Sequence, residues 1–125
     1  MRRLWVERDI EAPAAVVWDL LTDTACWAAW GPSVRGAELD GGVLVPGATG
    51  TVETVGGVTL SFVITSVVEG SSWSWDVEGV AATDHRVLPL GDDRCRAGFG
   101  VPWLVAPYGA VCALALRRLD ALATG

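Results

Sequence analysis

Apolar and polar side chains alternate over several short stretches of this chain, and such alternation is typical of half-buried β-strands. The clearest example is residues 72–78, where Trp73 and Trp75 fall on one side and Asp76 and Glu78 on the other. Glycine-containing turns separate most of these stretches, as in an antiparallel meander. We therefore predict strands at residues 4–10, 34–39, 51–55, 58–68, 72–78, 81–90 and 95–101, a brief edge strand at 43–46 and a turn at 47–50.

Two short helices are predicted between the first and second strands. Pro13 suits the first turn of a helix over about residues 13–21, whose apolar residues share one face. Thr24 is a suitable N-cap for a second short helix, which ends at Gly31.

The last part of the chain holds an uncharged run, residues 97–116, that is long enough to cross a bilayer. It contains two prolines and three glycines, and its first half alternates like a strand. We therefore predict no membrane span but a strand followed by a long helix over residues 107–122, with Pro107 in its first turn. Apolar residues occur on nearly every side of that helix, so we expect it to be buried against a broad surface.

The predicted order of elements is one strand, two short helices, a run of antiparallel strands and a long terminal helix. This order indicates an α+β architecture, in which a curved antiparallel sheet of about seven strands wraps around the C-terminal helix. The chain has 125 residues and no repeat or linker-like segment, so we expect a single domain over residues 1–125.

The charge balance argues against a nucleic-acid partner. The formal net charge is −6, and the nine basic residues form no stripe that would follow a phosphate backbone. Three separated cysteines and one histidine make no metal-ligand set, so we expect no metal and no cofactor. Free thiols and the lack of an apolar leader favour a cytoplasmic protein. We expect a monomer or a homodimer.

The chain resembles the START-like superfamily, also called SRPBCC, first in the segment IEAPAAVVWDLLTD at residues 10–23. The resemblance continues in WAAWGPSV at residues 27–34, with looser matches at 73–75, 85–87 and 91–94. It covers nearly the whole chain and is strongest toward the polyketide cyclase/dehydratase-like branch. The resemblance implies a helix-grip fold with a hydrophobic cavity between the long helix and the sheet. This chain is shorter than many members, so we expect a small cavity.

The resemblance leaves two functions open, because a shared fold does not define an activity. One is a cofactor-independent polyketide cyclase/dehydratase-like enzyme of bacterial secondary metabolism, which positions a reactive apolar chain for ring closure or loss of water. The other is a non-catalytic carrier or sequestering protein for a small hydrophobic or aromatic ligand. A polar side chain that points into the cavity favours the enzyme, and an entirely apolar lining favours the carrier.

The predicted cavity wall consists of the inward-facing members of the strands and of the helices that cover them. Seven tryptophans are present against two phenylalanines and one tyrosine, so large apolar rings with a single N–H donor dominate. Trp27 and Trp30 share one face of the second short helix, and we expect them to form an apolar lid at the entrance. The predicted ligand-binding residues are Trp27, Trp30, Leu60, Phe62, Ile64, Trp73, Trp75, Phe99 and Val111.

His85 and Tyr108 are the candidate catalytic residues. His85 is the single histidine and would serve an enzyme as its base, whereas its strand neighbours Asp84 and Arg86 point to the other face. Tyr108, the single tyrosine at the start of the last helix, would donate a hydrogen bond to a ligand carbonyl or enolate. Each residue also has a structural interpretation, as a backbone-bonded strand histidine and as a cap on the core beside the cavity mouth.

Overall fold

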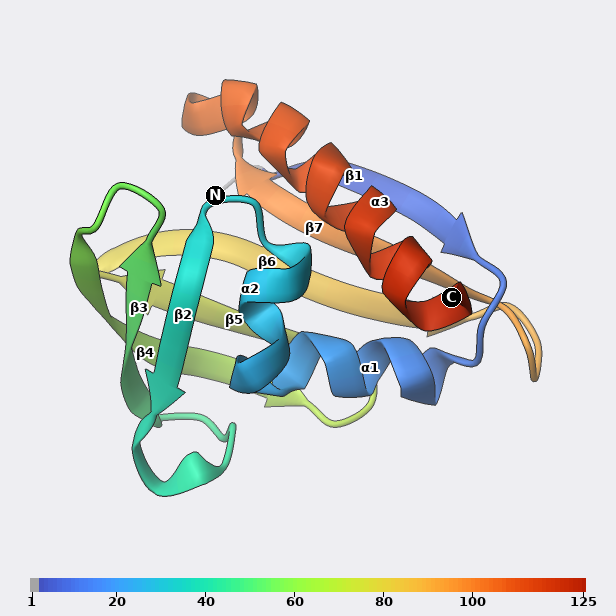
Figure 1. Ribbon diagram of the computed structural model, residues 1–125, viewed down its shortest axis with the longest axis horizontal. Coiled ribbons are helices and arrows are strands. Elements are labelled where there is room, and N and C mark those ends of the chain that lie inside the picture. Colours follow the sequence, from blue (N-terminus) through green and yellow to red (C-terminus); the bar gives the residue numbers. More distant parts are fainter. Residues whose placement is uncertain (1–2) are drawn as a thin grey trace.

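Seven strands form one antiparallel sheet in the order β1-β7-β6-β5-β4-β3-β2 (Figure 1). The computed structural model describes residues 3–125. The strands are β1 (Arg3–Ile10), β2 (Val34–Leu39), β3 (Thr49–Thr54), β4 (Thr59–Val68), β5 (Ser72–Val77), β6 (Val80–Pro89) and β7 (Cys95–Pro102).

Helices follow the first strand and the last strand. α3, the C-terminal helix, is 16 residues long, and it packs on β1, β7, α1 and α2. None of the helices in residues 3–125 is both long and apolar enough to cross a membrane. The helices are α1 (Ala14–Thr22), α2 (Trp27–Trp30) and α3 (Gly109–Thr124), with short 3₁₀ turns η1 (Thr24–Cys26), η2 (Asp40–Gly42) and η3 (Trp103–Tyr108).

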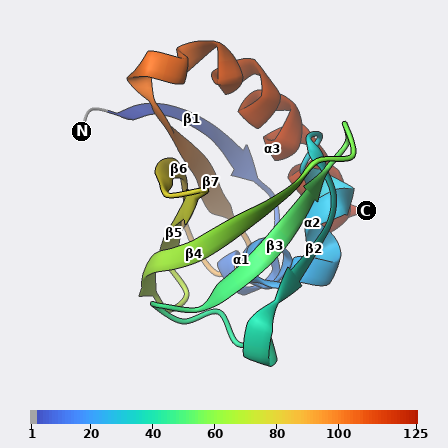
Figure 2. The same cartoon turned by 90° about the vertical axis from the view of Figure 1, so that its left-hand side faces the viewer.

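The sheet curls so that its concave face surrounds the space beneath α3 (Figure 2). Its register shifts on both sides of β5, between Ile64 and Ser66 and between Ser74 and Asp76. Such irregularities bend a strand and increase its twist. The predicted α+β helix-grip architecture, with two short helices after the first strand, is therefore confirmed.

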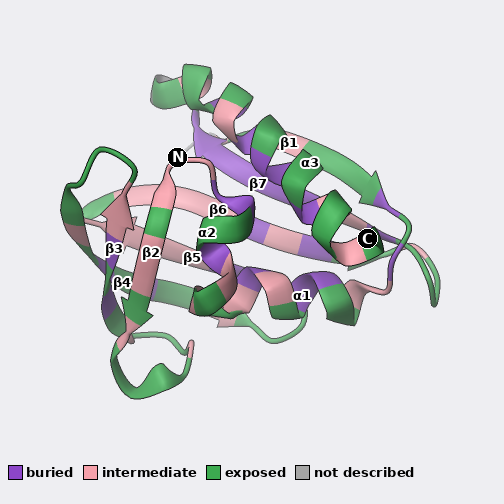
Figure 3. Cartoon of the chain, in the orientation of Figure 1, coloured by how far each residue is buried: buried purple, intermediate pink, exposed green. Residues whose placement is uncertain are grey.

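The core lies between the concave face and the helices, where the buried residues gather (Figure 3). The strands supply every second side chain to it, as the alternation predicted. Its largest fully buried side chains are Trp27, Trp73, Phe62, Ile10, Leu21, Ile64, Leu116 and Leu119.

One side of α3 is buried and the other faces solvent, so the expected burial against a broad surface holds for one side of this helix only. Leu114 and Leu122 are exposed at 37% and 45% although both are apolar. The concave side of the sheet covers only one face of α3. Much of the remaining surface of α3 is alanine, whose small side chain exposes little apolar area to solvent. The buried residues are Gly109, Cys112, Ala115, Leu116 and Leu119.

Pro107 lies in the 3₁₀ turn η3 and not in the first turn of the long helix, which begins at Gly109. Within η3, Val105 leaves helical geometry with φ −116° and ψ 34°. Proline lacks an N–H and is tolerated in such a short turn as it is at a helix start. The prediction of a helix start near Pro107 was therefore two residues early.

The predicted edge strand at residues 43–46 is absent, because this segment is a loop. Val43 and Val45 are exposed at 61% and 45%, so its apolar residues bury no common face. The predicted turn at 47–50 is partly wrong, since Thr49 and Gly50 belong to β3. A side chain at Gly50 would collide with the Phe62 ring packed above it, which explains a glycine inside a strand.

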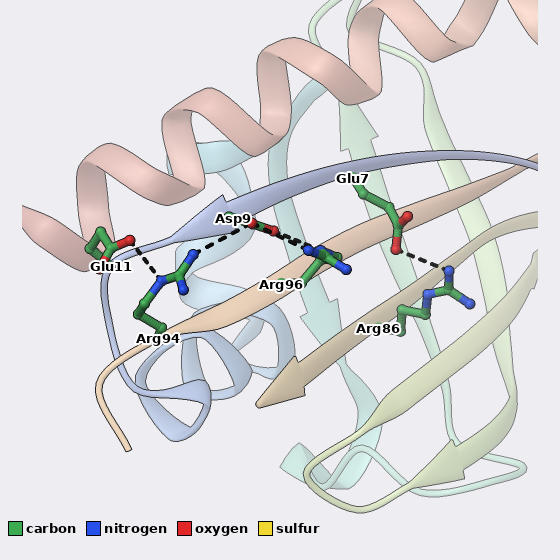
Figure 4. A network of polar contacts seen from close by, with 6 residues as sticks. All are labelled: Glu7, Asp9, Glu11, Arg86, Arg94 and Arg96. Atoms are coloured by element: carbon green, nitrogen blue, oxygen red, sulfur yellow. Dashed lines mark hydrogen bonds and ion pairs between the residues drawn. The ribbon is translucent and has the colours of Figure 1, made fainter. Parts of the chain in front are cut away.

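The convex face of β1, β7 and β6 carries a ladder of alternating carboxylates and arginines (Figure 4). Asp9 accepts from Arg96 at 2.7 Å, and this hydrogen bond is the main cause of the lowered pKa of Asp9. The other pairs of the ladder are Glu11 with Arg94 at 2.8 Å and Glu7 with Arg86 at 3.1 Å. The ladder thus joins the edge strand β1 to its neighbour β7 and, across β7, to β6.

Candidate functional site

The concave face holds two adjoining cavities. The outer cavity has a volume of about 340 Å³ and opens beside η3, where Val105 and Tyr108 are 51% and 39% exposed. The inner pocket has about 50 Å³ and lies between β5, β6, β7 and the helices α2 and α3. Five residues belong to both walls and so form the junction between them: Ser33, Val34, Trp75, Thr83 and Tyr108.

The inner pocket is built from aromatic side chains that strand register brings together. Trp73 of β5 pairs with His85 of β6, and His85 pairs in turn with Phe99 of β7. The Trp73 and His85 rings are stacked at 3.8 Å between centroids, and Phe99 meets His85 edge-on at 5.3 Å. Adjacent residues on one face of a sheet thus form a continuous aromatic surface.

The helix α2 places two further tryptophans on this surface. Trp27 stacks on Trp73 at 5.2 Å, and Trp30 lies 5.5 Å from Phe99. Their indole N–H groups donate to the carbonyl oxygens of Leu21 and Leu20, which ties α2 to the end of α1. Trp27 and Trp30 are only 1% and 6% exposed, so they form an inner wall and not a lid at the entrance.

A directed chain of hydrogen bonds fixes the protonation of His85. Its Nδ1 lies 3.2 Å from the carbonyl oxygen of Trp73, which can only accept, so Nδ1 carries the proton. Its Nε2 is then an acceptor, and the hydroxyl of Thr83 donates a hydrogen bond to it at 3.1 Å. Thr83 Oγ1 accepts in turn from the indole N–H of Trp75 at 3.1 Å. Both ring nitrogens of His85 are therefore occupied.

Burial keeps the His85 imidazole neutral. His85 is only 3% exposed. The loss of hydration on burial lowers the pKa of its imidazole from 6.5 to about 3. The hydrogen bond to the Trp73 carbonyl acts in the opposite direction and does not compensate. At neutral pH the ring is uncharged, and its lone pair is engaged by Thr83.

Tyr108 stands at the junction of the two cavities, immediately before α3. Its hydroxyl lies 2.8 Å from the hydroxyl of Ser33, in the connection between α2 and β2. Both residues line the inner pocket and the outer cavity. One of the two hydroxyls donates its hydrogen bond to the other. The second O–H of the pair remains free to donate to another acceptor.

The structure brings most of the predicted site residues together. Trp27, Trp30, Trp73, Phe99 and Val111 line the inner pocket with His85, and Leu60 lines the outer cavity. Trp75 and Tyr108 line both. Phe62 and Ile64 line neither, because they are packed into the core at 2% and 0% exposure, with Phe62 against Trp27 and Trp75.

Several residues of the two cavity walls were not predicted from the sequence. Thr83 lies on the inward face of β6 in line with His85, so alternation from His85 is the signal that identifies it. Ser33 and the residues of η3 come from irregular segments, where no periodicity marks an inward side. The further residues of the outer wall are Val34, Val52, Thr54, Val77, Ala81, Ala82, Val101, Pro102 and Val105.

Neither wall contains a charged side chain among the described residues. Both cavities therefore favour an uncharged, mainly apolar ligand, because removing an unpaired charge from water has a large free-energy cost. Residues 3–125 also hold no group of three or more histidine, cysteine or acidic side chains that would bind a metal ion.

A larger hollow of about 580 Å³ lies outside this site, between α1 and the loop after β2. It is open, and it contains acidic side chains, among them Asp19, Asp23 and Glu69. Glu69 accepts from the indole N–H of Trp18 at 3.3 Å. Its acidic, open character makes it a poor candidate for an apolar ligand.

A curved antiparallel sheet that holds a C-terminal helix over an apolar cavity defines a START-like helix-grip domain. The chain belongs to the family described as polyketide cyclase/dehydrase and lipid transport, which matches residues 1–123. No curated protein matches it significantly.

Solved structures share this fold over almost the full chain. XoxI from Bacillus cereus has a TM-score of 0.77 at 12% identity and covers 98% of this chain and 96% of its own. A START superfamily protein from Mycobacterium smegmatis has a TM-score of 0.75 at 12% identity, over 98% and 97% of the two chains. Protein CV1439 from Chromobacterium violaceum has a TM-score of 0.71 at 16% identity, over 100% and 99%.

Proposed function

We propose that this protein binds one small, uncharged and largely apolar molecule on the concave face and holds it without transforming it. The main observation behind this proposal is the lining of the two cavities, which consists mostly of aromatic and aliphatic side chains and contains no charged one. Family membership supports the same class of ligand, since the family description includes lipid transport.

The state of His85 favours a carrier over an enzyme. A general base works best when its pKa lies near the working pH, and a pKa of about 3 leaves His85 a weak base at neutral pH. Its Nε2 lone pair also accepts from Thr83, so a substrate would have to displace that hydroxyl first. The polar groups of His85, Thr83 and Trp75 thus satisfy one another.

The binding proposal can be tested with the neutral fluorophore N-phenyl-1-naphthylamine. Leu60→Trp places a large ring in the outer cavity, and Val63→Trp adds the same ring on the exposed face of the same strand. We expect wild type and Val63→Trp to bind the probe alike, and Leu60→Trp to bind it at least about tenfold more weakly. No binding by wild type, or equal binding by all three, would overturn the proposal.

A cyclase or dehydratase is the second candidate, and the position of Tyr108 is the observation that favours it. The hydroxyl pair of Tyr108 and Ser33 keeps a donor at the junction of the cavities, where it would polarise a ligand carbonyl. In that case a poly-β-carbonyl substrate would be converted, and His85→Gln or Tyr108→Phe would lower turnover by about 10²–10⁴-fold. Unchanged substrate after incubation with wild type supports the carrier.

A further inference from the structure

Trp73 has a buried hydrogen-bond donor that no group of the protein satisfies. The residue is 1% exposed, yet its Nε1 is the one buried side-chain nitrogen or oxygen without a partner among the described residues. The neighbouring indoles differ in this respect, because Trp27 and Trp30 donate to backbone carbonyls and Trp75 donates to Thr83. Unsatisfied buried donors are rare in native proteins and call for an explanation.

The position of Trp73 connects this donor with the ligand site. Its ring stacks on Trp27 and on His85, and the residue forms part of the wall of the inner pocket. Among the other polar side chains of that wall, Thr83 is bonded to His85. Ser33 is bonded to Tyr108, and the remaining O–H of that pair lies at the junction with the outer cavity.

The size of the inner pocket limits what it can receive. A cavity that holds benzene has about 150 Å³, whereas the inner pocket has about 50 Å³. A carbonyl group or a similar small polar end fits this space, and a ring does not. The outer cavity of about 340 Å³ adjoins it and has room for the apolar body.

We infer that the inner pocket is a subsite for one uncharged acceptor oxygen of the ligand, which accepts a hydrogen bond from Nε1 of Trp73. This inference rests on the proposed binding function and adds the chemical class of the ligand, an apolar ketone, quinone or similar neutral oxygen compound. Ligands with a carboxylate or phosphate group are excluded from this site, since neither wall has a charged side chain that would balance the negative charge.

The test compares 1-tetralone with tetralin, two bicyclic molecules of similar shape of which only 1-tetralone has a carbonyl oxygen. Affinities for both are measured for wild type, for Trp73→Phe and for the control Trp30→Phe. The control also removes an indole N–H from the inner wall, but that N–H already donates to Leu20. We expect Trp73→Phe to reduce the affinity for 1-tetralone relative to tetralin by about five- to tenfold, and Trp30→Phe to leave the ratio unchanged.

The outcomes separate this inference from the binding function. If Trp73→Phe keeps the wild-type ratio, the acceptor subsite is wrong while binding of apolar molecules stands. If neither probe binds to wild type, both proposals fail.

A second measurement on wild type does not depend on the folding of a variant. In a spectrum of ¹⁵N-labelled indole groups, the Trp73 signal should shift downfield with 1-tetralone and stay in place with tetralin. An unchanged signal, or a bound water that persists beside this indole at saturating 1-tetralone, would overturn the inference.

Discussion

The hydroxyl oxygens of Ser33 and Tyr108 lie 2.8 Å apart, although the two residues are separated by 75 positions in the chain. Their hydrogen bond joins the connection after α2 to the turn that leads into α3. Both side chains belong to the junction of the cavities, so this bond spans the boundary between the inner pocket and the outer cavity.

Removing that hydrogen bond should loosen the entrance more than it destabilises the fold. Tyr108→Phe and Ser33→Ala are each expected to lower the free energy of unfolding by about 0.5–1 kcal/mol, because the pair is partly solvated. Release of N-phenyl-1-naphthylamine should become faster in both, as measured by stopped-flow fluorescence. The double variant should match the single variants, whereas additive losses would mean that the two hydroxyls act independently.

Thr83 should matter through its hydroxyl and not through its size. Thr83→Val leaves the N–H of Trp75 and the Nε2 of His85 without partners, so we expect a loss of about 1–3 kcal/mol in the free energy of unfolding. Thr83→Ser keeps the hydroxyl and should lose less, as measured by urea denaturation. A loss in Thr83→Ser as large as that in Thr83→Val would show that the methyl group contributes as much as the hydroxyl.

Acid should destabilise the protein through His85. Its pKa is about 3 in the folded state and near 6.5 when exposed, so between these values the unfolded chain binds a proton that the folded chain does not. This contribution to stability is complete above pH 6.5 and is lost as the pH falls toward 3, by at most about 1.4 kcal/mol per pH unit.

The measurement is urea denaturation of wild type and His85→Gln between pH 7 and pH 4. Carboxylates titrate in the same interval but are common to both proteins, so the difference between the curves isolates His85. The stability of His85→Gln should fall less steeply than that of wild type. Parallel curves would contradict a buried neutral imidazole.

Two glycine substitutions should differ sharply. A Cβ at Gly50 would meet the carbonyl of Glu38 and the ring of Phe62, whereas a Cβ at Gly36 has no heavy atom within 4 Å. We therefore expect Gly50→Ala to reduce the free energy of unfolding by about 2–3 kcal/mol, and Gly36→Ala to change it by less than about 0.5 kcal/mol. Thermal and urea unfolding test this, and equal effects would contradict the packing of Phe62 over β3.

Alternation alone was enough to predict much of the sheet and part of the site. Trp73 and Trp75 face inward as expected, since the side chains of a strand have a strict period of two. The same rule could not separate the cavity wall from the packed core. Phe62 shares the face of Leu60, but the ring of Trp27 fills the space above it, and that contact depends on where α2 lies.

Long-range contacts explain the remaining differences. The neutral state of His85 depends on its burial between Trp73 and Phe99 of the neighbouring strands, so it follows from register and not from residue type. Glycine is typical of turns, yet Gly50 lies in a strand. The ring of Phe62, twelve positions later, leaves no room there for a Cβ. Ser33 lies in a loop, where no pattern signals a partner near the other end of the chain.

The sheet order has a consequence for how the chain folds. β1 has a single neighbour, β7, and their register pairs Arg3 with Pro102 and Ile10 with Cys95. The first strand of this sheet along the chain can therefore pair only after the last one is available. Closing so large a loop has a high entropic cost, so we expect slow folding, with the meander β2–β6 formed first and β1 docked late.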